Sequence, residues 1–288
     1  MRKFILKVGL FIVLFFLINI LYLILIQKFD WNFSKRIEAI NLKNPAYENI
    51  ILGNSYAMDG IDSKLLSNNT TNTYNLAIGG AGLNTNYIQL SEYLKIAHVK
   101  PKRVVLGVGS HQENFFKKNK LHPIVEFTAL NYNYTLNDLP VAKFKWIFIE
   151  LVKKIISSEH RNAELVQGQL RVTRTVADKT KKAKTTNTIP FSAYENSEDL
   201  KQITELCKQN GIELLLIEMP GFRNTRNNKA IGPYEIDYQH SNKVKLYNFN
   251  GPAIDTVFDS NDDWLGDSHL NKKGAKKFTE YLKNYLIL

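Results

Sequence analysis

The sequence predicts an α/β protein with a three-layer, doubly wound parallel sheet, preceded by one transmembrane helix. Short apolar runs that suit buried strands alternate with segments whose apolar residues recur at helical spacing. This alternation is typical of a parallel sheet with helices on both faces. An uncharged apolar stretch stands near the N-terminus, and the chain of 288 residues is long enough to form a large core behind it.

Residues 8–26 are interpreted as a retained membrane anchor within the segment 1–26. They contain no charge and one polar residue, Asn19, and a helix of this length crosses a bilayer at about 1.5 Å per residue. The end of the stretch lacks the small residues of a signal-peptide cleavage site. Basic residues precede it: Arg2, Lys3 and Lys7. The positive-inside rule therefore predicts a single-pass protein of the cytoplasmic membrane with an extracytoplasmic domain.

The rest of the chain is divided into a juxtamembrane linker, 27–48, and one domain, 49–288. Five strands are predicted in the domain: 49–52, 74–78, 103–108, 212–219 and 243–249. Each is a short run rich in apolar or β-branched residues, and glycine or proline stands beside several of them.

Helices between these strands are predicted from their apolar faces and their caps. Asn84 or Thr85 is predicted to begin the helix before the third strand. Another helix is predicted over 197–209, with Gly211 at its end. Asn271 is predicted to cap the closing helix. The inner face of that helix would be Ala275, Phe278, Leu282 and either Tyr285 or Leu286.

Residues 115–195 interrupt this alternation of strands and helices and are predicted to form a helical insertion over the top of the sheet. Their basic residues include Arg171, Arg174, Lys179, Lys181, Lys182 and Lys184. The whole chain carries a formal net charge of +11. Charge of one sign beside a cleft concentrates an anionic polymer, although a solvated loop has the same composition. The sequence contains no nucleic-acid-binding motif, so no nucleic acid is expected as a partner.

Cys207 is the single cysteine, so the chain forms no internal disulfide. It lies beside Leu206 in a helical pattern and is interpreted as a small core hydrophobe rather than a reactive thiol. The histidines are scattered, and no pair has the spacing of a zinc site. Neither a metal nor a cofactor is therefore expected.

Ser55 is the candidate nucleophile. It follows the first predicted strand directly, in Gly53-Asn54-Ser55, and ligands bind at the carboxyl ends of strands in open α/β folds. Backbone N–H groups at the start of the following helix can stabilise an oxyanion. The triplet alone favours a simpler interpretation, in which Ser55 is only a helix cap.

His269 and Asp267 are the candidate base and its orienting acid, just before the closing helix. A carboxylate two residues before a histidine can reach the imidazole Nδ1–H and leave Nε2 facing a serine. Asp262 and Asp263 are close enough to compete for the acid's role. We predict that His269 lies within hydrogen-bond distance of the Ser55 hydroxyl, across more than half of the chain.

Two glycine-rich segments follow the second and third strands at the same predicted sheet edge. Gly79 and Gly80 are predicted to form an oxyanion hole with the N–H of Ser55, although a plain turn explains the pair equally well. Further residues predicted at the pocket are Asn54, Gly109, Ser110 and His111.

Taken together, these segments resemble the SGNH (GDSL-like) hydrolase superfamily. The resemblance covers residues 49–112 and 196–286, and it lies in the order and spacing of the motifs more than in residue identity. Residues 51–55 resemble the family's nucleophile block, and residues 75–80 resemble its oxyanion block. The family's doubly wound, flavodoxin-like sheet is the fold that this resemblance implies.

Two blocks depart from the family pattern. Residues 107–110 stand where the family has Gly-x-Asn-Asp, so the oxyanion asparagine is absent, and the acid stands two rather than three residues before His269. These features are similar to a membrane-anchored subgroup, the alginate-type O-acetyltransferases and the D-alanyl transfer protein of teichoic acid assembly. The resemblance implies acyl-ester chemistry on a cell-envelope glycan, beside a multi-pass membrane acyltransferase.

The sequence therefore predicts a serine-dependent O-acyltransferase or esterase that uses Ser55, His269 and Asp267 on a cell-envelope polysaccharide. Its expected partners are a cell-surface glycan or acyl donor, a multi-pass membrane acyltransferase, and the membrane itself. The competing hypothesis is a catalytically inactive SGNH-like scaffold that binds glycan or the membrane partner. The absent asparagine favours the scaffold, and the Ser, His and Asp set favours the enzyme.

Overall fold

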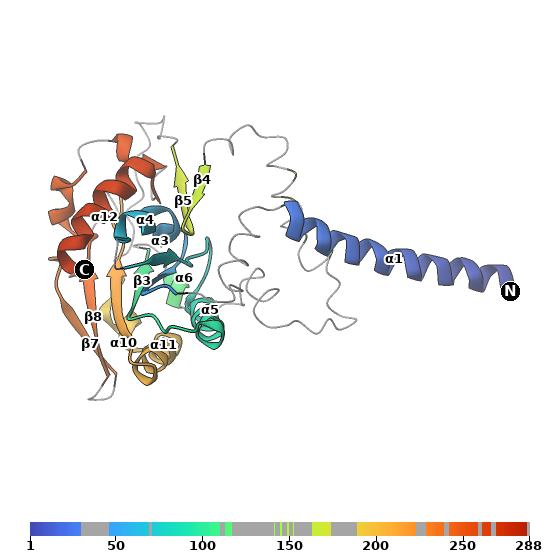
Figure 1. Ribbon diagram of the computed structural model, residues 1–288, viewed down its shortest axis with the longest axis horizontal. Coiled ribbons are helices and arrows are strands. Elements are labelled where there is room, and N and C mark those ends of the chain that lie inside the picture. The colour runs from blue at the N-terminus through green and yellow to red at the C-terminus, as the bar shows by residue number, and fades with distance from the viewer. Residues whose placement is uncertain are drawn as a thin grey trace.

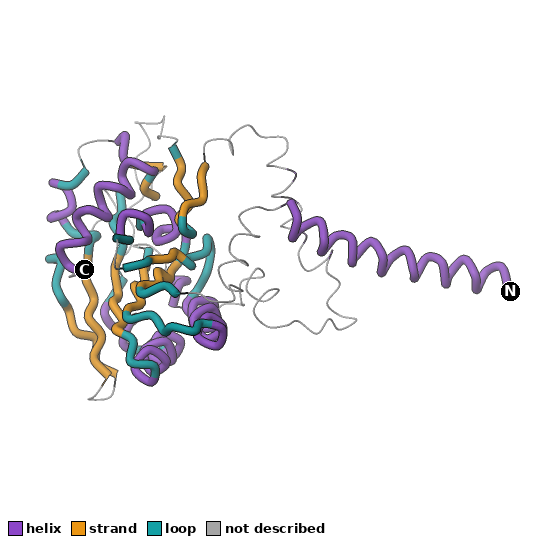
Figure 2. Tube along the Cα trace, viewed as in Figure 1, coloured by secondary structure: helices purple, strands orange, loops and turns teal. Residues whose placement is uncertain are grey.

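The computed structural model describes an N-terminal helix and a layered α/β body (Figure 1). Its described residues are 1–29, 46–68, 71–109, 113–116, 141, 145, 149, 152, 163–173, 189–222, 229–238, 242–258, 261–265 and 269–286. Helix α1 (Arg2–Phe29) projects away from the body, whose central sheet lies between two layers of helices (Figures 1 and 2).

The central sheet has six strands in the order β2-β1-β3-β6-β8-β7. Their bounds are β1 Asn49–Gly53, β2 Thr73–Asn75, β3 Arg103–Val108, β6 Glu213–Glu218, β7 Tyr234–Tyr238 and β8 Asn242–Asn248. The first five strands in this order are parallel, which confirms the predicted sheet, and β7 pairs antiparallel with β8 at one edge. Strand β7 was not predicted, although its alternation of Tyr234, Ile236 and Tyr238 with charged residues is the pattern of a half-buried edge strand.

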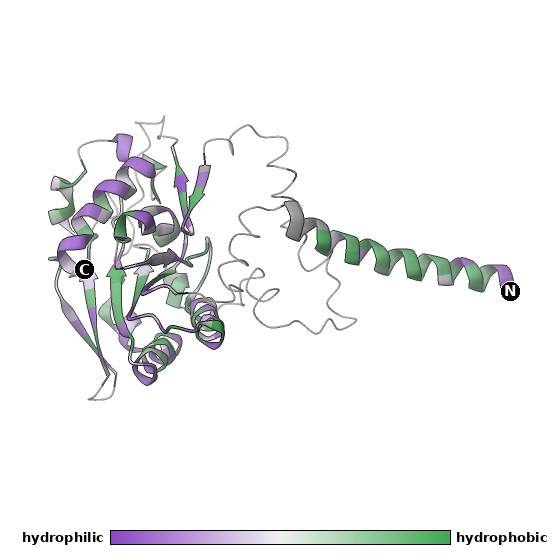
Figure 3. Cartoon of the chain, in the orientation of Figure 1, coloured by the Kyte–Doolittle hydropathy of each residue, from purple (hydrophilic) through white to green (hydrophobic). Residues whose placement is uncertain are grey.

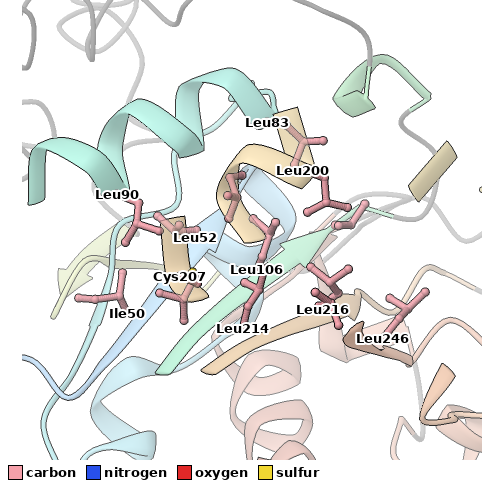
Figure 4. Packing of buried hydrophobic residues seen from close by; sticks show 14 of the residues in the cluster. Ile50, Leu52, Leu83, Leu90, Leu106, Leu200, Cys207, Leu214, Leu216 and Leu246 are labelled. Atoms are coloured by element: carbon pink, nitrogen blue, oxygen red, sulfur yellow. The ribbon is translucent and has the colours of Figure 1, made fainter. Parts of the chain in front are cut away.

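Helices cover both faces of the sheet, as a doubly wound fold requires. On one face, α5 (Leu83–Ile96) and α11 (Glu198–Gln209) pack their apolar sides on the central strands. Figure 4 shows side chains of these two helices, among them Leu90 and Cys207, over the strand residues of the same cluster. The opposite face is covered by α12 (Lys272–Leu286) together with α3 (Ser55–Gly60).

Short elements complete the body. They are α4 Ser63–Leu66, α6 Glu113–Phe116, α10 Phe191–Glu195, the 3-10 helices Pro252–Thr256 and Asn261–Asp263, and the two-stranded ribbon β9 Trp264–Leu265 with β10 His269–Leu270. The ribbon is antiparallel and leads directly into α12. It therefore joins the last helix to the edge of the sheet at which β1 ends.

Two of the predicted helix starts are confirmed. The Ser197 side chain accepts a hydrogen bond from the Leu200 N–H at the start of α11, at 3.3 Å. The Asn271 side chain accepts from the N–H groups of Lys273 and Gly274, both at 3.0 Å, at the start of α12. Each cap satisfies N–H groups that the first helical turn leaves without partners.

The predicted start of α5 is wrong by one or two residues. Its N-cap is Gly82, which provides no side-chain hydrogen bond, and the helix begins at Leu83. The side chain of Asn84 instead accepts from the N–H of Thr85 inside the first turn. Leu83 is fully buried, so packing against the sheet extends this helix beyond the polar residues that suggested its start.

The described part of the insertion contains a β-hairpin that the sequence analysis did not predict. Strands β4 (Ala163–Val166) and β5 (Gln169–Val172) are joined by a tight turn, and the Gln167 carbonyl accepts from the Asn75 N–H at 2.9 Å. Arg171 donates to both carboxylate oxygens of Asp62, at 2.7 and 2.9 Å. Arg171 was expected among the basic residues that attract a glycan, and in the structure its charge is paired with Asp62 in a largely buried ion pair. The other basic residues named for the insertion lie outside the described residues.

The interpretation of Cys207 as a core residue is confirmed. Its side chain is buried beneath α11, with 1% of its surface exposed. Burial raises the pKa of the thiol to about 12, because an apolar surrounding disfavours the thiolate.

Helix α1 is long and apolar enough to cross a membrane. The part that could span a bilayer is Arg2–Tyr22, with a mean hydropathy of 2.7, and 6% of its apolar stretch is buried inside the protein. Apolar residues line most of the helix (Figure 3). Its polar residue Asn19 is satisfied, since it donates to the Phe15 carbonyl at 2.9 Å and accepts from the Val141 N–H at 3.0 Å.

We predict that deleting residues 1–26 leaves a soluble, folded domain. The two core clusters draw their residues from the strands and helices that follow position 46, so the deletion removes none of their contacts. Circular dichroism should show the α/β spectrum with a cooperative melt, and gel filtration should show a discrete species. Aggregation of the truncated chain, or cleavage of the exported full chain near residue 27, would contradict the anchor assignment.

Candidate active site

Ser55 stands at the first position of α3, immediately beyond the end of β1. Asn54 is the N-cap of this helix, and its side chain accepts from the Tyr56 N–H at 3.1 Å. The chain reverses at Gly53, whose φ is +138°, a conformation that side chains rarely allow. A Cβ at Gly53 would lie 2.3 Å from the Gly107 carbonyl oxygen. The turn that presents Ser55 therefore requires glycine.

His269 reaches the site from the other end of the chain, in the two-residue strand β10. Its Nε2 lies 2.8 Å from the Ser55 Oγ, a normal hydrogen-bond distance. The predicted proximity of the two side chains is confirmed, despite a separation of 214 residues in sequence. Both residues are half-buried, so the pair is held by the protein and is still open to a substrate.

Tyr56 is part of the site, although it was not among the residues predicted from the sequence. Its ring stacks on the His269 imidazole with a centroid distance of 4.6 Å and an interplanar angle of 27°. Tyr56 is 5% exposed. An aromatic residue directly after the candidate nucleophile was the available signal, but the sequence alone does not show which ring faces the histidine.

Gly79 and Gly80 form a turn at the carboxyl end of β2, closed by a 3.0 Å hydrogen bond from the Ala81 N–H to the Ile78 carbonyl. Gly80 has a φ of +78°, as the third position of a type II turn requires. A Cβ at Gly79 would lie 3.8 Å from the Ser55 Cβ, so this glycine adjoins the serine. Within the described residues, the N–H groups of Ser55 and Gly79 donate no hydrogen bond and are available to a ligand.

Two buried amide side chains fix the loops around Ser55, and sequence reasoning missed both. Asn86 accepts from the Gly53 N–H at 2.8 Å and donates to the Gly82 carbonyl at 2.7 Å. Asn75 donates to the Ala57 carbonyl at 2.9 Å and accepts from the Ala77 N–H at 3.0 Å. Each amide forms hydrogen bonds to two separate segments: Asn86 connects Gly53 with Gly82, and Asn75 connects α3 with the loop after β2. The two amides therefore hold the turn at Ser55 beside the turn at Gly79 and Gly80.

Four other residues were predicted at the pocket, and the structure describes two of them, Asn54 and Gly109. Asn54 is fully buried and caps α3, so it does not line an open pocket. Gly109 is buried beneath the Tyr56 ring, and a Cβ there would lie 2.4 Å from the Tyr56 Cδ2. Ser110 and His111 lie outside the described residues.

The acid of the predicted triad lies outside the described residues, because Asp267 belongs to the segment 266–268. Its competitor Asp263 is fully buried, and its Oδ2 accepts from the Lys277 Nζ at 2.9 Å. This ion pair ties the start of the β9–β10 ribbon to α12. The main chain of Asp262 accepts from the Asn271 side chain at 2.6 Å. No group of three His, Cys, Asp or Glu side chains in the described part of the chain could hold a metal ion.

No family model matches this sequence, and no curated protein matches it. Among solved structures, one similar chain is a protein from Streptococcus pneumonia described as a proposed platelet activating factor. The TM-score is 0.43 at 12% identity, and the alignment covers 94% of this chain and 98% of that chain. A likeness of this size does not identify a function, so any function must rest on the geometry of the site.

We predict that Asp267, and neither Asp262 nor Asp263, orients the His269 imidazole. Turnover of an ester substrate should fall by about 10⁴-fold in Asp267→Asn, because an amide stabilises the wrong imidazole tautomer. Asp263→Asn should instead lower the melting temperature, since it breaks the contact with Lys277, and should leave turnover of the folded protein nearly unchanged. A loss of turnover confined to Asp263→Asn or Asp262→Asn would show that another carboxylate has this role.

Proposed function

We propose that this protein is an SGNH-type serine esterase or O-acyltransferase that acts on a cell-envelope polysaccharide. The observation that carries the proposal is the 2.8 Å contact between Ser55 Oγ and His269 Nε2. A serine hydroxyl is a weak nucleophile until a base takes its proton, and an imidazole nitrogen at this distance can do so. The position of Ser55 after a parallel strand, at the start of a helix, adds support.

The proposed reaction has two steps that use the same groups. The Ser55 Oγ attacks the acyl carbonyl carbon while its proton passes to His269 Nε2, and the leaving alcohol then takes that proton as the old ester bond breaks. Water or a sugar hydroxyl next attacks the acyl-enzyme, and its proton returns through His269 to the serine. Esterase and transferase differ only in this acceptor.

Main-chain donors would stabilise the oxyanion in this proposal. The N–H groups of Ser55 and Gly79 are available beside the nucleophile, and Gly80 is one residue further along the same turn. Because Gly109 has no side chain and lies beneath Tyr56, it provides no third, side-chain donor. This absence is also what favours the competing proposal, an inactive scaffold that only binds its ligand at the same site.

An acidic acceptor is favoured by the charge at the start of α12. This helix begins three residues after His269 with Lys272 and Lys273, both exposed, and has no acidic residue in its first turn. The Lys272 Nζ lies 3.8 Å from a carboxylate oxygen of Glu164, and both of these side chains are exposed. Positive charge at a helix N-terminus opposes the helix dipole, so it adds no stability to the helix. Lysines at this position would instead attract an anionic polymer towards the serine.

The membrane assignment of the proposal rests on α1. If the basic residues before the span remain in the cytoplasm, the domain faces the cell envelope, where acidic polysaccharides and acyl donors meet. A multi-pass membrane acyltransferase is the proposed source of the acyl group. The anchor would hold the domain at the surface on which such a partner works.

We predict that Ser55 is the single site of labelling by a serine-directed fluorophosphonate. Labelling and ester turnover should be lost in Ser55→Ala, and turnover should fall by about 10⁴-fold or more in His269→Gln, because the base is absent. Ser192→Ala is the matched control, since Ser192 is an exposed serine near the start of another short helix. A folded wild-type protein that resists the label would favour the scaffold.

We also predict that Lys272→Ser with Lys273→Ser weakens binding to an acidic surface polysaccharide and flattens its dependence on salt. Exposed charges are screened over about 8–10 Å at physiological ionic strength, so the wild-type affinity should fall as salt is added. The matched control is Lys100→Ser with Lys102→Ser, which removes the same charge from exposed residues at the opposite end of the strands. Equal effects of the two pairs would mean that only the net charge matters.

A further inference from the structure

The Tyr56 ring contacts both the candidate base and Gly109. One of its faces stacks on the His269 imidazole, at a centroid distance of 4.6 Å. The ring also meets Gly109, where a Cβ would lie 2.4 Å from Cδ2 and 2.7 Å from Cε2. Real Cβ atoms do not approach other atoms so closely, so the ring fills the space that a side chain at position 109 would need.

The backbone that carries Tyr56 is held equally firmly. Ala57, the next residue of α3, packs against Gly107, where an added Cβ would lie 2.7 Å from the Ala57 Cβ. The N-terminal turn of α3 is capped by Asn54. Because α3 packs directly against β3 at the residue next to Tyr56, the backbone of Tyr56 has little freedom to move.

His269 stands in a short element, and its ring is in contact with Ser55 and Tyr56. It belongs to a strand of two residues, and the outer torsion of a histidine side chain has a broad energy minimum. A ring plane that turns by a few tens of degrees would move Nε2 away from the Ser55 Oγ. Stacked aromatic rings prefer near-parallel planes, so the Tyr56 ring restrains the plane of the imidazole.

We propose that Tyr56 is a positioning residue, which holds the His269 imidazole so that Nε2 faces the serine, and that Gly109 lacks a side chain because the Tyr56 ring occupies its space. The catalytic meaning of this role rests on the proposed function. The stack itself is a property of the resting protein and can be measured without turnover.

The first experiment compares Tyr56→Leu, Tyr56→Phe and Tyr93→Leu in the full chain. Tyr56→Leu should lower kcat for an ester by about tenfold or more at an unchanged KM, because the base is misaligned only where the transition state needs it. Tyr56→Phe keeps the ring and should retain wild-type kcat. Tyr93→Leu makes the same change at a fully buried tyrosine on the opposite face of the sheet, and should lower stability without changing kcat of the folded protein.

A spectroscopic measurement accompanies the kinetics. The ring current of a stacked tyrosine shifts the imidazole protons of His269 upfield in the proton NMR spectrum. This shift should persist in Tyr56→Phe and Tyr93→Leu and disappear in Tyr56→Leu. If Tyr56→Leu folds with wild-type kcat and leaves the His269 proton signals at their wild-type positions, the positioning role is wrong. If Tyr56→Phe is as impaired as Tyr56→Leu, the hydroxyl and not the stack matters.

A double-mutant cycle tests the role of Gly109. Gly109→Ala should lower the melting temperature strongly in the wild-type chain, and much less in the Tyr56→Leu background, where the space is free. Equal losses in both backgrounds would overturn the proposed coupling. Neither the cycle nor the NMR shift needs activity, so both can succeed even if Ser55 proves unreactive. If Ser55 is labelled but the NMR shift and the coupling are both absent, the positioning role is wrong and the proposed function still stands.

Discussion

The close approach of helix α3 to strands β1 and β3 is the constraint on which the rest of the site depends. Gly53 and Gly107 leave no space for a side chain between these strands and Ala57. The helix can therefore begin directly at the end of β1, with Ser55 at its first position. A larger residue at either glycine would push the helix away from the sheet, and the serine with it.

The second half of the site is brought to the first by the closing helix. Phe278 and Leu282 of α12 are fully buried against the sheet, and each such side chain contributes about 1.5–3 kcal/mol. Asn271 caps this helix, and the Asp263–Lys277 ion pair joins it to the ribbon before it. His269 lies within this assembly, so the packing of an apolar helix face determines where the imidazole stands.

The contact between Tyr56 and Gly109 affects the segment that follows β3. In the resemblance to SGNH hydrolases, Gly109 stands where an oxyanion asparagine is expected, and the structure has no room for that side chain because Tyr56 fills it. The chain thus combines an aromatic support for its histidine with main-chain N–H groups beside its serine. An esterase or transferase built in this way would depend on main-chain donors for its oxyanion.

The sequence by itself determined the features that depend on neighbouring residues. The parallel strands, the caps Ser197 and Asn271, the buried Cys207 and the two ends of the Ser55–His269 pair all have local signals, namely apolar runs, capping side chains and short motifs. Only the tertiary structure decided the contacts between distant segments. These include the Tyr56 stack on His269, the amide bridge of Asn86 to Gly53, and the hairpin held to the start of α4 by Arg171 and Asp62. Such contacts depend on the shape of the space left when helices pack on a sheet, and no short stretch of sequence specifies that space.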